Sequence, residues 1–379
     1  MSESILIATI MRPDGVTGVQ THFRAFSSYL VDHGYSTQLI TPFNWHQWQV
    51  YPVFALRKLI DLFNGPISVW WYRYWHAMFL KIALQHAVTN DKSCVIYAQC
   101  PLSADAALRA RSSKKQRVVM VVHFNISQAE EWVEKGKISV GSALFESIRL
   151  FESEVLPNLD GLVFVSEFMR LELVKRIPAI ENVPFRVIPN FLRDPGLAPD
   201  SATTARDLIC IGTLEPRKNQ RYAIEIVAAA KSINRTLSLT IVGEGPSRSE
   251  LELLCKHLGV SDQVKFTGFV KNGSTLLSQH RACFHVAQLE NLPLTLIEAL
   301  AYGKPIFAPA VGGIPEVFSD EVEGKVIPLN DAKAAAQLIV AWLDSDNVMK
   351  EAGIAARERY LSSFEETVIA RKLLDFLRN

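Results

Sequence analysis

Short runs of apolar, mostly β-branched residues alternate along this chain with longer stretches in which apolar residues recur at helical spacing. The alternation predicts βα units and a parallel sheet. Because the short runs are apolar at nearly every position, we expect helices on both faces of that sheet. In the first half, strands are predicted at residues 5–10, 37–41, 94–98, 117–123, 161–165 and 186–188, with helices between them, for example at 18–33 and 143–156.

The pattern starts again after Pro195. Residues 191–207 are rich in Pro, Ser, Thr and Gly, which is typical of a linker. Beyond them, strands are predicted at 208–212, 238–242, 264–267, 283–286 and 305–308, helices at 219–232, 247–258, 293–302 and 331–343, and a last amphipathic helix at about 363–376. The fold class is therefore α/β, with two tandem Rossmann-like, doubly wound domains. Ligands bind beyond the carboxyl ends of such strands, so we expect the site in a cleft between the domains.

Composition excludes several other classes of protein. A chain of 379 residues, 49% of them hydrophobic, is long enough for two ordinary cores. The formal net charge of +1 gives no field for nucleic acid, so no nucleic-acid partner is expected. None of the five cysteines has the C-x-x-C spacing of a metal or redox site. The chain lacks an apolar run that could span a membrane and a signal peptide, so a cytoplasmic location is expected.

Two strand-to-helix turns carry pairs of glycines. Gly15 and Gly18 lie in the first turn of the chain, and Gly243 and Gly245 follow a strand of the second half. Glycine lets a ligand approach the backbone closely, and a helix start offers N–H groups to an anion. Taken alone, each turn is equally well explained as a simple chain reversal.

A pair of cations, Arg217 and Lys218, follows the first strand of the second half and precedes a helix. Two cations beside a helix N-terminus suit a diphosphate whose negative charge grows as it leaves. A solvated charge pair in a loop is the alternative.

Residues 285–316 carry the largest number of candidate groups. Glu290 stands in a loop and Glu298 on the following helix, eight positions later. We expect the two carboxylates to contact different parts of one extended ligand, such as a sugar and a ribose. The backbone amides of Asn291 and Leu292 are expected to be exposed and to meet phosphate or sugar oxygens. A capped amphipathic helix with exposed glutamates is the alternative.

In order and spacing, these stretches resemble the retaining GT-B glycosyltransferases of family 4, the group 1 glycosyltransferases, which include bacterial mannosyltransferases and sucrose synthases. The resemblance runs from Ile5 to about Phe376. Its most specific part is residues 290–298 followed by "ALAYGKPIFAPAVGGIPE", and the next is "IGTLEPRKN"; "VIPNF" and "VSEFM" match weaker blocks.

The resemblance implies an N-terminal acceptor-binding domain at residues 1–192, completed by a crossover helix at 361–379, and a C-terminal donor-binding domain at 193–360. It implies transfer of a hexose-type sugar from a UDP- or GDP-linked donor to an acceptor, with retention at the anomeric carbon. No metal is expected, and no cofactor besides the nucleotide-sugar donor.

The same resemblance implies a set of site residues. Expected catalytic residues are Glu290, His123 and Lys218, and expected donor-binding residues are Gly18, Arg217, Lys218, Gly243, Glu290, Asn291, Leu292 and Glu298. Lys218 and Arg217 would hold the diphosphate. Glu290 and His123 would lie beside the donor sugar, and Glu298 would hold the ribose. The family is described as using a same-face displacement, so Glu290 is expected to orient the donor and stabilise charge without forming a covalent bond.

The sequence departs from the family pattern at several positions. Gly18 would approach the donor phosphates, but Thr17 stands where a glycine doublet is usual. Thr213 replaces a common arginine, for which Arg217 is a possible substitute. "NLP" at 291–293 replaces the usual Gly-Phe-Gly beside the sugar, and Phe191 replaces a glycine, so the identity of the donor sugar is left open.

Residues 45–84 hold five of the seven tryptophans, namely Trp45, Trp48, Trp70, Trp71 and Trp75. From residue 50 onward, four cations (Arg57, Lys58, Arg73 and Lys81) stand against one acid, Asp61. Aromatic residues together with cations are favoured at a membrane interface. We therefore predict peripheral contact of residues 45–84 with the inner face of the cell membrane and an acceptor that is a lipid-linked glycan or glycolipid of cell-surface polysaccharide synthesis. An internal aromatic patch or a dimer surface is the alternative.

Other functions fit the same fold. The acceptor could be a soluble small molecule, or the chain could be a sugar-nucleotide epimerase that needs no acceptor. It could also be a catalytically inactive partner subunit, although the presence of both glutamates and Lys218 argues against this.

Overall fold

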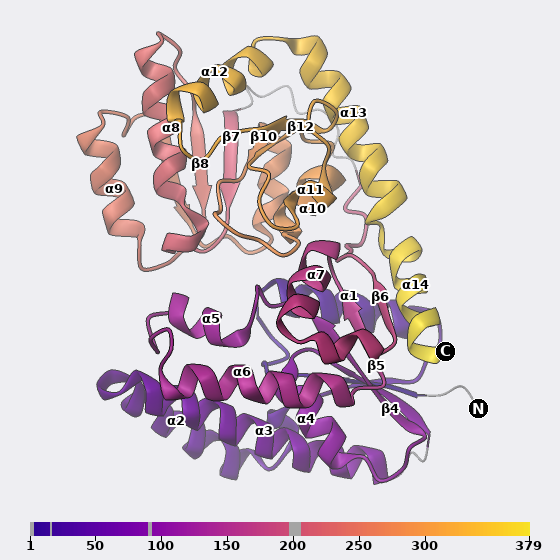
Figure 1. Ribbon diagram of the computed structural model, residues 1–379. Helices are drawn as coiled ribbons and strands as arrows, with labels where there is room; N and C mark the ends of the chain where they lie inside the picture. Colours follow the sequence, from indigo (N-terminus) through magenta and orange to yellow (C-terminus); the bar gives the residue numbers. More distant parts are fainter. Residues whose placement is uncertain (1–3, 16, 90–92, 197–205) are drawn as a thin grey trace. The chain divides into compact units, whose positions relative to one another are not determined.

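A computed structural model describes residues 4–15, 17–89, 93–196 and 206–379 of the chain (Figure 1). The chain divides into two compact units: an N-terminal unit of Met1–Asn190 with Ile369–Asn379, and a C-terminal unit of Phe191–Val368. Each unit has a sheet of six parallel strands. The predicted α/β class with two doubly wound units is confirmed. Residues 197–205 of the predicted linker lie outside the described residues.

The sheet of the N-terminal unit has the order β2-β1-β3-β4-β5-β6. Its strands are β1 (Ser4–Ala8), β2 (Thr37–Ile40), β3 (Cys94–Ala98), β4 (Gln116–Val122), β5 (Gly161–Phe164) and β6 (Phe185–Val187). Strand β3 has the predicted bounds, and the ends of the other strands differ from the predicted ones by at most two residues, because a β-branched apolar run marks a buried strand but not where its hydrogen bonds end. The strand order reverses between β1 and β3, and the loops that follow these two strands diverge there.

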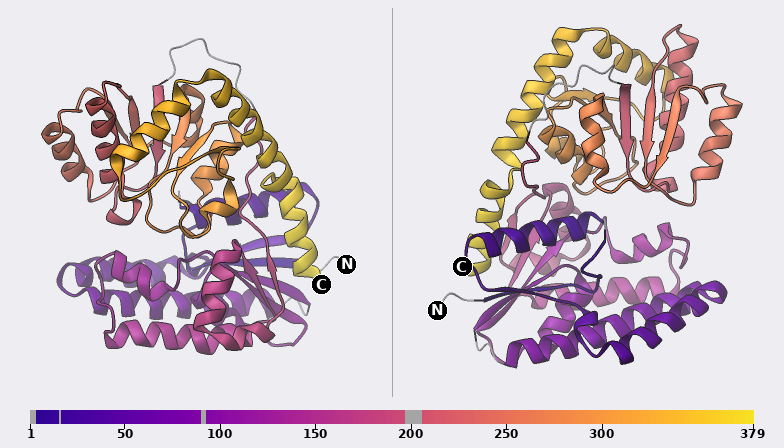
Figure 2. Two further views of the ribbon diagram at one scale, coloured as in Figure 1. Left: turned by 45° about the horizontal axis from the view of Figure 1, so that its top comes forward. Right: turned by 180° about the vertical axis from the view of Figure 1, so that it is seen from behind.

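Helices cover both faces of this sheet, with α1 (Gly18–Asp32) on one face and α3 (Gly65–Thr89) and α4 (Pro101–Ala110) on the other (Figure 1). Leu6 and Ala8 of β1 pack in the core that also contains Leu80 and Leu84 of α3. A second helix, α2 (Gln47–Phe63), lies beside α3 (Figure 2). The remaining helices are α5 (Gln128–Glu134), α6 (Ala143–Val155) and α7 (Glu167–Arg176).

The sheet of the C-terminal unit has the order β12-β11-β10-β7-β8-β9. Its strands are β7 (Arg206–Ile211), β8 (Leu239–Val242), β9 (Val264–Gly268), β10 (His280–Phe284), β11 (Ile306–Ala308) and β12 (Gly324–Val326). Strand β12 is not among the predicted strands, because three residues on an edge give too short an apolar run to recognise.

The helices of the C-terminal unit are α8 (Gln220–Ser232), α9 (Arg248–His257), α10 (Leu294–Ala301), α11 (Ile314–Val317), α12 (Ala332–Leu343) and α13 (Asp346–Ser363). The last helix, α14 (Glu366–Arg378), has its residues from Ile369 onward in the N-terminal unit. Leu373, Leu374 and Leu377 of this helix are buried, whereas Val368 is exposed. Among the described residues, no helix is both long and apolar enough to cross a membrane.

Candidate functional site

Strands β7 and β10 are neighbours in the C-terminal sheet, although two strands and four helical segments separate them in the sequence. Their loops leave the same edge of the sheet, because parallel strands end together. The strand order reverses at this point, and such switch points are where open α/β sheets bind ligands. The loop after β7 carries Arg217 and Lys218, and the loop after β10 carries His285 and Glu290.

The loop after β7 has a defined local structure. A single 3₁₀ turn covers Pro216–Lys218, with proline at its first position, where the fixed φ of proline suits a helical turn. Asn219 then takes a left-handed conformation with φ of 56°, and α8 begins at the next residue. The side chain of Gln220 donates a hydrogen bond to the carbonyl of Thr213 at 2.8 Å. These contacts hold the two cations at the end of the strand.

The two loops meet in a buried ion pair. Lys218 Nζ donates to Glu290 Oε1 at 2.5 Å. The same oxygen lies 3.4 Å from a guanidinium nitrogen of Arg217 and 3.5 Å from Nε2 of His285. Burial alone would raise the pKa of Glu290, but Lys218, His285 and Arg217 together hold it well below its usual range. Glu290 is therefore a carboxylate whose charge is balanced before any ligand binds.

The sequence predicts Lys218 and Glu290 as separate site residues. The structure shows that they form a direct ion pair, although 72 positions separate them in the sequence. It also adds His285, which is absent from the predicted site. This histidine is buried, and its pKa is lowered because of burial. Strand β10 ends at Phe284, so His285 is the first residue of the loop. The predicted strand ran from 283 to 286 and included His285, so the sequence did not mark this residue as part of the site.

Hydrogen bonds to backbone carbonyls join these loops. The amide of Gln288 donates to the carbonyl of Arg217 at 3.2 Å, and Arg217 returns a bond from its guanidinium to the carbonyl of Leu289 at 3.3 Å. The amide of Gly313 donates to the carbonyl of Glu290 at 2.9 Å. Gly312 has φ of +57°, and a Cβ at this position would lie 2.1 Å from the same carbonyl oxygen. Glycine at position 312 is therefore required for Glu290 to occupy its place.

Gly243, predicted to bind the donor, directly follows β8 and lies beside Gly212, which directly follows β7. Its φ is +138°, and a Cβ there would lie 2.0 Å from the carbonyl oxygen of Gly212. The two strand ends thus approach more closely than any side chain allows. This contact explains the glycine, and contact with the donor stays a prediction.

Glu298 lies on α10 in a different environment from the ion pair. Burial raises the pKa of its carboxyl to about 7, although a hydrogen bond from Ser274 acts in the opposite direction. Within the described part of the chain, it has no ion pair with Lys218 or any other cation. Asn291 and Leu292 are buried residues between Glu290 and α10, and contact of their backbone amides with phosphate or sugar oxygens stays a prediction.

Two predicted residues, Gly18 and His123, belong to the N-terminal unit. Gly18 is the exposed first residue of α1. Thr17 and Gln20 form a capping box at the start of this helix, in which the backbone amide of each residue donates to the side chain of the other. From the sequence, free amides were expected at this helix start, and the capping box was not predicted. Contact of Gly18 with donor phosphates stays a prediction.

His123 directly follows β4 and lines a cavity of about 170 Å³. Its ring packs edge-on against His22 at 4.6 Å between centroids, and His22 Nε2 lies 3.0 Å from the hydroxyl of Tyr97. Burial lowers the pKa of both histidines, that of His22 to about 3, so both rings are neutral. Nε2 of His123 has no hydrogen-bond partner among the residues that the structure describes. His22 was not predicted, because its partners are remote in sequence.

The arrangement in the C-terminal unit can bind an anion beside a fixed carboxylate. Lys218 and Arg217 supply charge at the end of a strand, and Glu290 supplies an acceptor for hydroxyl groups within reach of both. No group of three or more His, Cys, Asp and Glu side chains that could hold a metal ion occurs within residues 4–15, 17–89, 93–196 and 206–379.

Comparison with known proteins gives matches along nearly the whole chain. The family model "Glycosyltransferase Family 4" matches residues 16–193, and "Glycosyl transferases group 1" matches residues 198–359. A GDP-mannose-dependent alpha-(1-6)-phosphatidylinositol monomannoside mannosyltransferase of Mycobacterium tuberculosis is 26% identical over 306 residues, which is 74% of each chain.

Solved structures show the same fold. Sucrose-phosphate synthase from Thermosynechococcus elongatus superposes with a TM-score of 0.74 at 19% identity, covering 99% of this chain and 98% of the other. HepE of Anabaena, solved with UDP-glucose, gives a TM-score of 0.70 at 16% identity and covers 99% of both chains. The chain therefore belongs to the group 1, family 4 glycosyltransferases, and is a glycosyltransferase with the two Rossmann-like units of the GT-B fold.

Proposed function

We propose that this protein transfers a hexose from a UDP- or GDP-linked sugar to a lipid-linked glycan or glycolipid, with retention at the anomeric carbon. The observation that carries the proposal is the buried pair of Lys218 and Glu290 at the switch point of the C-terminal sheet. The donor class is supported by the GDP-mannose-dependent relative and by the UDP-glucose in HepE. The lipid acceptor is supported by the same relative, whose name specifies a phosphatidylinositol monomannoside.

Lys218 and Arg217 bind the diphosphate of the donor. During transfer the bond between the anomeric carbon and the phosphate oxygen breaks, and the electron pair leaves with the nucleoside diphosphate. Cations fixed where this charge develops stabilise the transition state more than the ground state. This role requires no metal ion, because two side chains already supply the positive charge.

Retention follows from a same-face displacement. The acceptor hydroxyl oxygen forms the new bond to the anomeric carbon, and its proton passes to the departing phosphate. Glu290 orients the sugar through its hydroxyl groups. The low pKa and three close partners of Glu290 support an orienting role, because an ion-paired carboxylate is a weak nucleophile. A glycosyl adduct on Glu290, detected by mass spectrometry after incubation with donor, would overturn this role.

A melting-temperature screen against UDP- and GDP-linked sugars tests the donor class. A ligand at about one hundred times its Kd stabilises a protein by about 2.7 kcal/mol. We expect one nucleotide sugar to stabilise the protein, and that sugar to be transferred to a membrane lipid extract. If no diphosphate nucleotide has an effect, the chain is an inactive partner subunit.

The affinity for the donor is expected to rise with pH because of Glu298. We propose that this carboxyl accepts hydrogen bonds from the ribose hydroxyls, which requires its ionised form. Since burial raises its pKa to about 7, affinity should increase about tenfold from pH 6 to pH 8. Titration calorimetry with an intact nucleotide sugar measures this, because the diphosphate of such a donor does not titrate in that range.

Glu298→Gln provides the control for this pH dependence. The variant should bind more weakly at pH 8 and show no slope between pH 6 and pH 8. Folding raises the pKa of this carboxyl, so in the unliganded protein it lowers stability as pH rises from about 4.5 through 7, and the variant should lose that effect too. An unchanged slope in Glu298→Gln would assign the titration to another group.

We also propose that the enzyme reaches its lipid acceptor at the cytoplasmic face of the membrane, through the segment of residues 45–84. The tryptophans of this segment differ in exposure. Trp71 and Trp75 pack within the α2–α3 pair, whereas Trp48 and Trp70 are exposed. The exposed Trp48 and Trp70 support contact with a lipid surface.

A further inference from the structure

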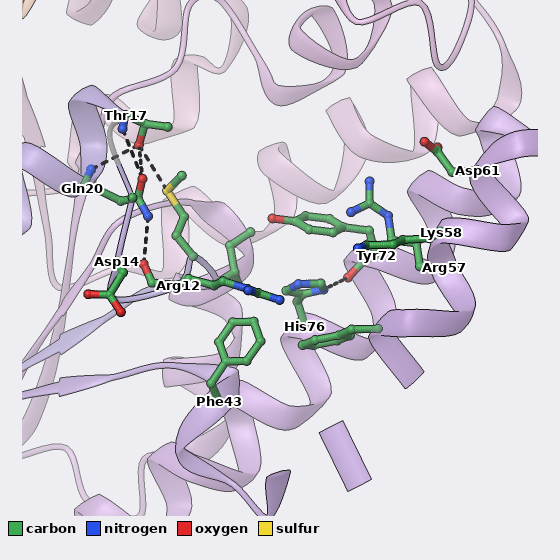
Figure 3. Close-up of a pocket in the computed structure, with 14 residues that line it drawn as sticks. Arg12, Asp14, Thr17, Gln20, Phe43, Arg57, Lys58, Asp61, Tyr72 and His76 are labelled. Carbon is green, nitrogen blue, oxygen red and sulfur yellow. Dashed lines mark hydrogen bonds between the residues drawn. The ribbon is translucent and has the colours of Figure 1, made fainter. Parts of the chain in front are cut away.

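A cavity of about 550 Å³ lies in the N-terminal unit, where the loop after β1 meets α2 and α3 (Figure 3). Its aromatic walls are Phe43, Phe54, Tyr72 and His76, and its cations are Arg12, Arg57 and Lys58. The site described so far uses none of these residues.

Contacts between α2 and α3 fix the aromatic wall. Phe54 of α2 stacks on His76 of α3, with 4.0 Å between ring centroids, and the indole nitrogen of Trp71 donates to the carbonyl of Val53 at 2.9 Å. The guanidinium of Arg57 lies 4.5 Å from the centroid of the Tyr72 ring. The wall is therefore formed before any ligand enters, and Arg57 is held as part of it.

Three cations line this cavity against two carboxylates, those of Asp14 and Asp61, so positive charge is in excess. Arg57 donates a hydrogen bond to Ser68 at 3.3 Å, but among the described residues neither Arg12 nor Lys58 has a carboxylate partner. Asp61 is paired with Lys137 at 2.8 Å, and the nearby charge of Arg57 also contributes to lowering the pKa of Asp61.

The other lining groups do not offset this charge. The carboxylate of Asp14 points away from the Arg12 guanidinium, which extends toward His76 (Figure 3). Burial lowers the pKa of His76 to about 3, helped by Arg57 and Arg12, so the ring is neutral. Three cations in an aromatic cavity suit a phosphate or diphosphate group.

The face of α2 opposite to the one that lines the cavity is apolar and exposed. Trp48, Leu59, Leu62 and Phe63 are 73%, 58%, 76% and 87% exposed, and their spacing places them on one side of the helix. Val50, by contrast, is completely buried. A single helix thus presents cations to a cavity and an apolar stripe to its surroundings, the combination that binds anionic lipid surfaces.

We propose that the cavity holds a phosphate group of a lipid acceptor, while the exposed stripe of α2 lies in the head-group region of the bilayer. This inference rests on the proposed function and adds that the lipid acceptor is phosphorylated. Charge complementarity favours an anionic lipid as the occupant, because the cavity cations Arg57 and Lys58 lie on the same helix as the exposed apolar stripe.

The position of the cavity relative to His123 supports this assignment. The cavity shares Ile10, Met11 and Tyr72 with the smaller one that His123 lines, so the two are contiguous. A lipid whose phosphate binds Arg12, Arg57 and Lys58 would extend its sugar toward His123. This places the reacting hydroxyl in the part of the unit where the donor sugar is expected.

Vesicle flotation tests the apolar stripe. The full-length protein should bind vesicles of phosphatidylcholine with phosphatidic acid, and Leu62→Gln with Phe63→Gln should weaken binding on the order of a hundredfold. The matched control is Leu253→Gln, which removes a leucine that is 63% exposed on α9 and should change nothing. Equal effects of both changes would overturn the proposal.

A charge pair tests the cavity. Arg12→Gln with Lys58→Gln should weaken binding to the same vesicles about fivefold for each lost cation. The control is Lys114→Gln with Lys115→Gln, which removes the same charge from an exposed loop of the same unit. Equal losses in both pairs would show that the cavity is not a phosphate site.

Two outcomes would identify another occupant. Stabilisation by inorganic pyrophosphate without binding of any vesicle would indicate a soluble phosphorylated acceptor. A dimer in sedimentation velocity that dissociates in the Leu62→Gln, Phe63→Gln variant and does not bind vesicles would assign the stripe to self-association. Both overturn the lipid. If nucleotide sugars still stabilise the protein while vesicles do not bind, this inference fails and the proposed transferase function stands; if no nucleotide sugar binds, the proposed function itself fails.

Discussion

Lys218→Met is expected to abolish transfer almost completely and to destabilise the protein. The variant loses the cation closest to the proposed diphosphate, and loss of one preorganised group at a developing charge lowers kcat on the order of 10²–10³-fold. It also leaves the buried carboxylate of Glu290 without its 2.5 Å partner. Breaking a buried ion pair in this way costs about 3–5 kcal/mol. Urea unfolding and donor turnover measure the two effects separately.

The double variant Lys218→Met, Glu290→Gln separates the catalytic from the structural role. It removes both charges, so much of the lost stability should return, whereas transfer should stay absent. Lys325→Met is the control in the same unit, because its partners Asp320 and Glu321 are exposed and the pair contributes less than about 1 kcal/mol. Near-normal turnover in Lys218→Met, or its recovery in the double variant, would contradict the proposed site.

The second large effect is expected from Gly312→Ala. The left-handed backbone costs an alanine about 1–2 kcal/mol, and forcing a Cβ to within 2.1 Å of the Glu290 carbonyl adds about 1–3 kcal/mol. The backbone can relieve this clash only by moving Glu290. A displacement of about 1 Å at a reacting centre lowers the rate about a hundredfold. Thermal unfolding and kcat/KM measure the effects on stability and catalysis.

Gly34→Ala separates backbone strain from crowding. Gly34 has a similar φ of +75°, but nothing lies within 4 Å of a Cβ placed there. It should lose about 1–2 kcal/mol and keep full activity. If the two variants lose stability and activity equally, the contact between Gly312 and Glu290 does not position the carboxylate.

Local sequence patterns are sufficient to predict most of the sheet elements. Strand β3 has the predicted bounds, Cys94–Ala98, because its apolar run is uninterrupted and helices cover both of its faces. The three-residue β12 and the helix α13 are not predicted. The first is too short, and the second has a weakly amphipathic sequence whose burial depends on α10.

The candidate site was predictable as a set of residues but not as an arrangement. Arg217, Lys218 and Glu290 each stand out by charge at the end of a strand. Their pairing depends on β10 lying beside β7, which the sequence order does not reveal. The exposed stripe of α2 could not be predicted for a similar reason. The sequence does not show which face of this helix packs against its neighbour and which stays exposed.

Amide hydrogen exchange gives the most direct test of the central claim, that the switch point of the C-terminal sheet binds the donor. Exchange would be measured on the whole protein with and without the nucleotide sugar that stabilises it most. We predict slower exchange in residues 213–220 and 288–292, the two loops joined by Lys218 and Glu290. Slower exchange only in other segments, with these loops unchanged, would contradict the assignment.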